Sequence, residues 1–186
     1  MKHVSSIQTP FAFFMLVSLI SAPSLYASDH EDHHEHREHG AHNHGHATLS
    51  IVQEDNNVQL MLESPAANLI GFEHTPNTLE EKKMADKALI TLRQGPMLFS
   101  FPPNAQCAQT SVEIESALTE HTEDHDSHSD ITVSYQFACN NPSALKSIDV
   151  QVFTLFPLTE EIDAQIMTDK RQFAAELTAQ QSIINF

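Results

Sequence analysis

Apolar and polar side chains alternate along much of this chain, and the alternation limits its fold more than any other feature of the sequence. Apolar residues occupy every second position from Ile131 to Cys139 and again from Ile148 to Val152. Because successive side chains of a β-strand point to opposite faces of a sheet, a period of two indicates strands with one buried face. The chain is therefore predicted to be mainly β.

The first hairpin is predicted within residues 47–62, with a polar turn at residues 54–57. The apolar positions that would share its buried face are Ala47, Leu49, Ile51, Val58, Leu60 and Leu62. Further strands are predicted at residues 97–101, 111–118, 131–139, 147–153, 162–167 and 173–177. Residues 64–76 contain two prolines and a glycine and are predicted to form an ordered loop.

One helix is predicted, from a cap at Asn77 or Thr78 to about residue 93. Glu80 follows Asn77 by three residues, as in a capping box, and a Gly-Pro pair at residues 95–96 ends the helix. Its buried stripe is expected to consist of Leu79, Ala85, Ala88, Leu89 and Leu92. These elements favour a mainly β, α+β fold: an antiparallel β-sandwich-like or barrel-like domain with one main helix and a flexible histidine-rich N-terminal tract.

Length and charge limit the number of domains and the kind of partner. The 186 residues suit a single β-rich domain, expected at residues 47–186. A formal net charge of −16 would repel the phosphates of nucleic acid, so nucleic acid is excluded as a partner. The same charge favours cations.

Residues 1–27 are predicted to be a signal peptide. Lys2 and His3 supply a positive end, residues 11–20 are mostly apolar, and Leu25-Tyr26-Ala27 suits cleavage after Ala27. A transmembrane anchor is the alternative, but a bilayer span needs roughly 20 apolar residues and this stretch is shorter. Cleavage would give a soluble exported protein, without stable membrane insertion, whose free end carries residues 28–46.

Residues 28–46 are predicted to be a metal-binding tract. Eight of the seventeen residues from position 30 to position 46 are histidine: His30, His33, His34, His36, His39, His42, His44 and His46. Neutral imidazole is a common ligand of zinc, copper and nickel, and the interleaved Glu and Asp residues add oxygen ligands. A solvated, disordered leader is the alternative. If the first strand begins early, His42, His44 and His46 lie on the face turned away from Ala47 and the core.

Cys107 and Cys139 are the only cysteines. In an oxidising compartment two cysteines are expected to pair, and this disulfide would stabilise the fold by about 3 to 4 kcal/mol. A thiolate metal site is the competing interpretation.

Three further histidines lie in a polar segment, residues 120–130, between the two cysteines. His121, His125 and His128 have i, i+4, i+7 spacing among acidic residues, so a helical turn or folded loop could gather them around one ion. A solvated loop is the alternative. His74 stands alone in an apolar loop, where it is either a structural residue or a fixed ligand for an ion shared with the tract.

Several motifs in a fixed order resemble one known family. They are HGAHNHGHATLSI (residues 39–51), SPAANLIGFEHTP (64–76), residues 99–107, YQFAC (135–139) and FTLFP (153–157). Over about residues 39–177 the chain resembles the ZrgA family of zinc-regulated zinc-uptake proteins. The resemblance implies a periplasmic protein of Gram-negative bacteria, produced when zinc is scarce, that assists a zinc ABC importer. The usual second histidine-rich insertion of the family corresponds to residues 120–130, which is short here.

The resemblance also implies the cargo, Zn²⁺, since imidazole-rich sites bind Ni²⁺ and Cu²⁺ as well. The chain is thus predicted to be a non-enzymatic zinc carrier, with the solute-binding protein or another component of the importer as its partner. A zinc-dependent hydrolase using His74 with histidines of the tract is one alternative, but the chain lacks an H-E-x-x-H motif and an evident nucleophile with its base. The other alternative is a non-catalytic envelope interaction domain whose histidines buffer metal.

Overall fold

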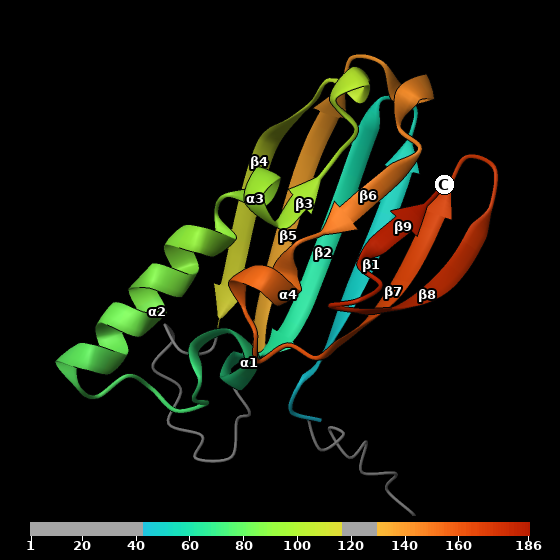
Figure 1. Ribbon diagram of the computed structural model, residues 1–186. Helices are drawn as coiled ribbons and strands as arrows, with labels where there is room; N and C mark the ends of the chain where they lie inside the picture. The colour runs from blue at the N-terminus through green and yellow to red at the C-terminus, as the bar shows by residue number, and fades with distance from the viewer. Residues whose placement is uncertain (1–42, 117–129) are drawn as a thin grey trace, which may run out of the picture. The chain divides into compact units, whose positions relative to one another are not determined.

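A computed structural model describes residues 43–116 and 130–186 of the chain, and in these residues two β-sheets are stacked (Figure 1). The larger sheet has six strands in the order β4-β5-β2-β1-β7-β8. Its strands are β1 (His46–Glu54), β2 (Asn57–Pro65), β4 (Cys107–Ser116), β5 (Asp130–Cys139), β7 (Glu161–Thr168) and β8 (Gln172–Thr178). The smaller sheet has the order β3-β6-β9, with β3 (Phe99–Ser100), β6 (Ser147–Val150) and β9 (Ile183–Asn185).

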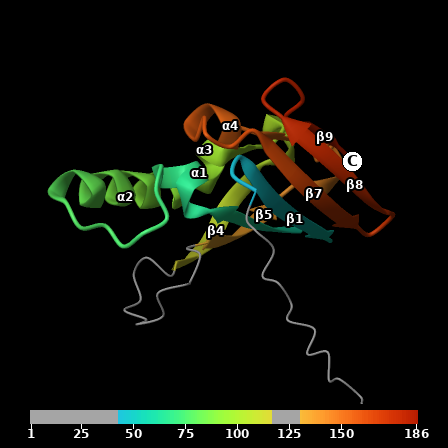
Figure 2. The ribbon, with the colours of Figure 1, turned by 90° about the horizontal axis from the view of Figure 1, so that it is seen from below.

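The helices are short except for one. They are α1 (Ala66–Ile70), α2 (Leu79–Leu92), α3 (Gly95–Leu98) and α4 (Val152–Leu155), with 3₁₀ turns η1 (Pro103–Ala105) and η2 (Pro142–Ala144). Figures 1 and 2 show the helices and the smaller sheet on one side of the larger sheet. None of the described elements covers the other face. The predicted fold class, a sandwich-like α+β domain, is confirmed, and the described sheets do not close into a barrel.

The predicted first hairpin is confirmed as β1 and β2. Leu49 pairs with Leu62 and Ile51 with Leu60, so the apolar positions of the two strands meet on the buried face. Neighbouring strands of the larger sheet are antiparallel with one exception, which the sequence did not indicate. β1 runs parallel to β7, and Ala47 pairs with Ile162.

The core fills the space between the two sheets. Tyr135, Phe99 and Phe137 are fully buried there, and the rings of Phe99 and Tyr135 meet edge to face with centroids 5.2 Å apart. The Tyr135 hydroxyl donates a 2.7 Å hydrogen bond to the carbonyl oxygen of Leu92, which ties the end of α2 to the sheet. Burial raises the pKa of this hydroxyl above its usual value.

The long helix α2 forms as predicted, with a different cap. Thr78 is the N-cap, its side chain accepts from the Glu81 backbone N–H, and the Glu81 carboxylate accepts from the Thr78 backbone N–H. The capping box is therefore Thr78 with Glu81, not Asn77 with Glu80. The prediction that Leu79 is buried was wrong, since Leu79 is 71% exposed. At 100° per residue Leu79 lies half a turn away from Ala88, which is buried.

Three predicted segments differ in detail. The loop at residues 64–76 contains α1. The strands expected at 97–101 and 147–153 are shortened to β3 and β6, because α3 takes the start of the first segment and α4 the end of the second. The short strand β9 was not predicted. In the described part of the chain, no helix is long and apolar enough to span a membrane.

The disulfide between Cys107 and Cys139 is confirmed. The two residues are direct partners across β4 and β5, and they close a loop whose ends are 32 positions apart. The interpretation of these cysteines as a thiolate metal site is therefore wrong.

Candidate metal-binding site

A tight turn joins the end of the histidine tract to β1. The His46 backbone N–H donates to the Asn43 carbonyl oxygen over 3.0 Å, and Gly45 adopts a φ of 89°. Such a φ favours glycine. A Cβ atom at Gly45 would also lie 3.2 Å from Cγ of Glu160, so a larger residue would have little space.

One buried side chain fixes this turn. Asn68 of α1 is 3% exposed; its Oδ1 accepts from the Gly45 N–H over 2.8 Å, and its Nδ2 donates to the His46 carbonyl oxygen over 2.8 Å. Nδ2 also lies 3.2 Å from the Ser64 hydroxyl. On the other side, the Gly45 carbonyl oxygen accepts from the N–H groups of residues 160 and 161, over 2.7 and 3.0 Å. The backbone of Gly45 and His46 is therefore held from two elements.

The side chain of His44 faces a glutamate from the loop after α1. Its Nε2 lies 3.2 Å from Oε1 of Glu73. That oxygen is enclosed by protein and has no hydrogen bond from any described group. A cation bound beside such an oxygen would compensate for its lost hydration.

A second pair lies on the outer face of the larger sheet. His46 and Glu161 are register partners on the parallel strands β1 and β7, and Nδ1 of His46 lies 3.3 Å from Oε1 of Glu161. The alternation predicted for β1 places His46 on the face away from Ala47, as expected. For His44 the condition of that prediction, an early start of the strand, is not met, because β1 begins at His46 after the turn at Gly45. We call His44, His46, Glu73 and Glu161 the histidine–glutamate site.

His74 forms a third, looser pair. Its Nε2 is 3.9 Å from Oε1 of Glu81, and its ring stacks on Phe72 with centroids 4.9 Å apart. The backbone N–H groups of Thr78 and Asn77 donate to the Glu81 carboxylate and hold the pKa of that carboxyl below its usual value. Glu81 thus serves the cap of α2, and the contact with His74 is secondary.

The separations in the histidine–glutamate site suit zinc. A tetrahedral zinc ion with Zn–N and Zn–O distances of about 2.1 Å holds its nitrogen and oxygen ligands about 3.4 Å apart. The two pairs have N···O distances of 3.2 and 3.3 Å. Within residues 43–116 and 130–186, however, no three His, Cys, Asp or Glu side chains come together closely enough to hold a metal ion. Each pair is therefore at most half of a zinc site.

An open cleft of about 410 Å³ borders the first pair. It is lined by residues that include His44, Asn68, Phe72, Glu73 and Glu160. Polar side chains and backbone groups both line this cleft. The histidine tract joins the domain here, at His44 and Gly45. Further ligands could reach the first pair from the cleft.

Only three of the predicted site histidines are among the described residues: His44, His46 and His74. The structure brings the first two together with carboxylates and leaves His74 in the looser pair. Outside the described residues lie His30, His33, His34, His36, His39, His42, His121, His125 and His128. Their role as metal ligands stays a prediction. The reasoning from sequence missed Glu73 and Glu161, because nothing in their local sequence indicates which histidine each would face.

The role of Asn68 leads to a prediction for stability. Asn68→Ala would leave the buried Gly45 N–H without an acceptor, so we expect the free energy of unfolding to fall by about 2 kcal/mol. Urea denaturation followed by circular dichroism measures the change. Gln165→Ala removes an exposed amide from β7 and should change stability by less than about 0.5 kcal/mol. Equal stability of the two variants would mean that the Asn68 hydrogen bonds contribute nothing.

The fold and the site together define a disulfide-linked domain of two stacked sheets that carries histidine–glutamate pairs where a histidine-rich tract joins it. The model of one family, described as ZrgA family zinc uptake protein, matches residues 41–186. The chain belongs to the ZrgA family, as its motifs indicated. A comparison with curated proteins finds no match for this chain.

Proposed function

We propose that this protein is a periplasmic, non-enzymatic carrier that captures Zn²⁺ and assists its uptake by a zinc ABC importer. Membership of a zinc uptake family is the observation that carries this proposal. The histidine–glutamate site supports it, because imidazole nitrogen and carboxylate oxygen are both zinc ligands. Export by the signal peptide expected at residues 1–27 would bring the protein to the compartment where the importer collects its cargo.

In this proposal both the tract and the domain contribute zinc ligands. The tract histidines exchange zinc among overlapping sets of three or four ligands, on the order of two ions in all. His44 and His46 belong to the tract by sequence, while Glu73 and Glu161 belong to the domain. These pairs would give an ion a partly ordered position, completed by further tract histidines, from which it is released to the solute-binding protein or another importer component.

A calorimetric zinc titration at two pH values tests the proposed function. The metal-stripped protein is expected to bind zinc at pH 7.5 and to bind it much more weakly at pH 5. Protons compete with zinc for imidazole nitrogen, so the affinity should fall steeply below about pH 6. Absence of binding at pH 7.5, or binding of undiminished affinity at pH 5, would contradict the proposal.

The contribution of the two glutamates is tested by a matched pair of variants. We expect Glu73→Gln with Glu161→Gln to weaken the tightest zinc site about tenfold, a size typical of losing a group that tunes or completes a metal site. Glu113→Gln with Glu176→Gln makes the same charge change on β4 and β8 and should leave the affinity within about twofold. Zinc affinities that agree between the two double variants would show that only the net charge matters.

A further inference from the structure

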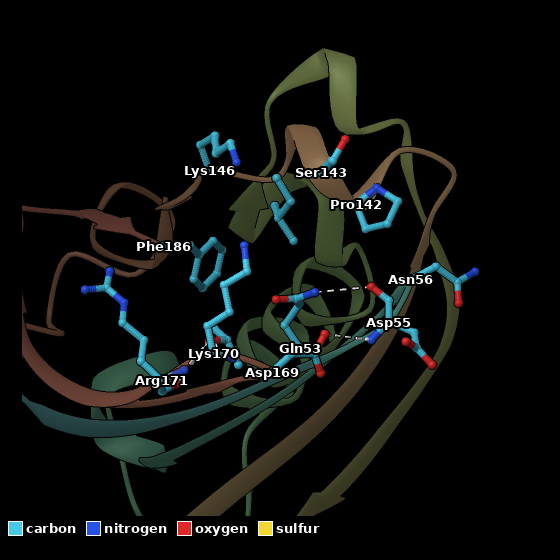
Figure 3. A pocket seen from close by; sticks show the side chains of 12 residues that line it. Gln53, Asp55, Asn56, Pro142, Ser143, Lys146, Asp169, Lys170, Arg171 and Phe186 are labelled. Atoms are coloured by element: carbon cyan, nitrogen blue, oxygen red, sulfur yellow. Dashed lines mark hydrogen bonds between the residues drawn. The ribbon is translucent and has the colours of Figure 1, made fainter.

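A second cleft lies at the end of the domain opposite to the histidine–glutamate site. It has a volume of about 730 Å³, and its lining includes Gln53, Asn56, Leu145, Lys146, Lys170 and Phe186 (Figure 3). His46 begins β1 and Asn56 follows its end, so about 26 Å of strand separates the two sites. A ligand in this cleft would not contact zinc bound at His44 or His46.

Positive charge is concentrated in this cleft. Lys146, Lys170 and Arg171 all line it, three of the nine basic residues of a chain whose formal net charge is −16. In Figure 3 the Lys170 side chain extends from the turn between β7 and β8 toward Phe186, on the side where Lys146 lies. No described residue forms an ion pair with either lysine ammonium. Two cations are therefore available to a ligand.

The other charged groups of the cleft either form contacts of their own or point away from Lys170. Arg171 donates to the Asn185 carbonyl oxygen over 3.0 Å and its guanidinium lies 4.3 Å from the centroid of the Phe173 ring. Asp169 Oδ2 accepts from the Asp55 backbone N–H over 3.4 Å. Figure 3 shows the Asp55 carboxylate turned away from Lys170. Neither carboxylate forms an ion pair with Lys146 or Lys170 among the described residues.

The chemistry of the lining favours one class of anion. Lysine binds phosphate and carboxylate alike, but arginine forks and clustered backbone N–H groups match the geometry of phosphate in particular. Here Arg171 is engaged, and η2 begins with Pro142, which has no N–H. A lysine ammonium binds an oxyanion as a point charge, and a carboxylate can be bound in this way. Leu145 and Phe186 add apolar surface suited to a short hydrocarbon chain, and Gln53 and Asn56 add amide groups.

We propose that this cleft is a binding site for carboxylates, with Lys146 and Lys170 as the groups that hold the charge and Leu145 with Phe186 against the hydrocarbon part. The carboxylate can belong to a free dicarboxylate or to an acidic segment of a protein partner. An acidic partner would be repelled by most of this surface, and this cleft is where its charge would be complemented. The site is independent of the proposed zinc function.

The test uses the full mature chain, stripped of metal, at low ionic strength. Glutarate, a capped pentaglutamate peptide and inorganic phosphate are titrated separately, and the amide signals of Lys146 and Lys170 are followed by NMR. We expect saturable shifts with glutarate, with the peptide or with both, which also identifies the source of the carboxylate. Lys146→Gln with Lys170→Gln should weaken this binding about tenfold, whereas Lys82→Gln with Lys87→Gln on α2 should change it less than twofold.

Three results would overturn the proposal: no saturable shift with either carboxylate probe, tighter binding of phosphate than of both carboxylates, or equal losses in the two double variants. Circular dichroism spectra confirm that each variant is folded. A zinc titration of the Lys146 and Lys170 double variant should match that of the unaltered protein, so failure of the cleft proposal and failure of the zinc proposal are distinguishable.

Discussion

Deletion of residues 29–37 is expected to remove about half or more of the zinc capacity of the protein. The deleted segment contains His30, His33, His34 and His36, four of the eight histidines of the tract. Because tetrahedral zinc takes three or four ligands, the loss of four imidazoles removes on the order of one ion. Zinc retained after equilibrium dialysis, measured by atomic absorption, gives the stoichiometry of each protein.

The deletion should leave the folded domain unchanged. Residues 38–186 form a compact unit of their own, and every described residue belongs to it. A matched variant replaces the four histidines with glutamine and keeps the length and the acidic residues of the segment. If the glutamine variant keeps full capacity while the deletion loses it, carboxylates hold the metal and the role given to imidazole is wrong. Full capacity in both proteins would remove the tract from the mechanism.

Loss of the disulfide is expected to cost about 3 to 4 kcal/mol of stability in a Cys107→Ser, Cys139→Ser variant. The bridge closes a loop between residues 32 positions apart. On the chain-entropy model, closing a loop of this length lowers the entropy of the unfolded chain and stabilises the fold by that free energy. Cys139 is buried, so placing a serine hydroxyl at this position adds a smaller loss of stability. Guanidinium denaturation gives the free energies of unfolding, provided that the transition is two-state.

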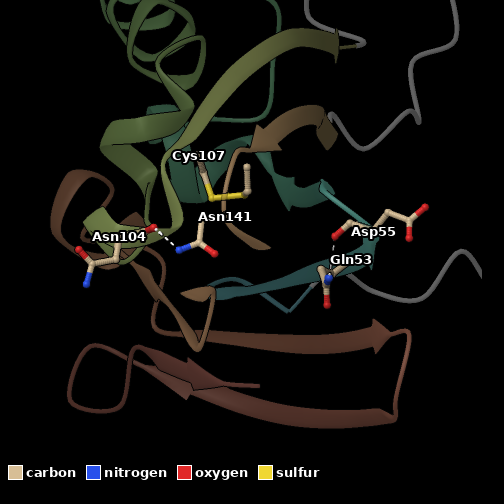
Figure 4. Close-up of a disulfide and its surroundings, with 6 residues drawn as sticks. Gln53, Asp55, Asn104, Cys107 and Asn141 are labelled. Atoms are coloured by element: carbon tan, nitrogen blue, oxygen red, sulfur yellow. Dashed lines mark hydrogen bonds between the residues drawn. A yellow bond between two sulfur atoms is a disulfide. The ribbon is translucent and has the colours of Figure 1, made fainter. Parts of the chain in front are cut away.

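The neighbourhood of the disulfide provides the control. Beside it, the Asn141 side chain donates to the Asn104 carbonyl oxygen over 3.1 Å (Figure 4). Asn141 directly precedes η2, and Asn104 lies in η1. Asn141→Ala should cost about 1 kcal/mol, much less than the loss of the bridge. Reduced unaltered protein should match the double serine variant within about 1 kcal/mol. A difference above that would assign the effect to the serine hydroxyls and not to the cross-link.

The strands were predictable from sequence where one face of the sheet is buried and the other is open. In β5, Ile131, Val133 and Tyr135 are buried while Ser134 and Gln136 are exposed, so the period of two is visible in the residues themselves. The same condition made β1, β2 and β7 predictable. It fails in β3, which has two residues and follows one turn of helix, α3. In β6 the alternation is present, but it extends to Val152, which already lies in α4.

Long-range pairing was not predictable, and the site depends on it. Parity along β1 was enough to place His46 on the outer face. Its partner Glu161 comes from a strand that ends up beside β1 only because the chain returns there in parallel. The contact of His44 with Glu73 likewise depends on the turn at Gly45 and on the hydrogen bonds of Asn68. Tertiary structure determines such contacts, and the local periodicity of the sequence does not indicate them.

The parallel partnership of β1 and β7 bears on how the protein is made. β1 occupies an interior place in its sheet, yet one of its two neighbours is synthesised more than a hundred residues later. Pairings so distant in sequence form slowly, and they cannot form at all while the later segment is still on the ribosome. The larger sheet therefore stays incomplete beside β1 until β7 has been synthesised, although the hairpin of β1 and β2 can form before then.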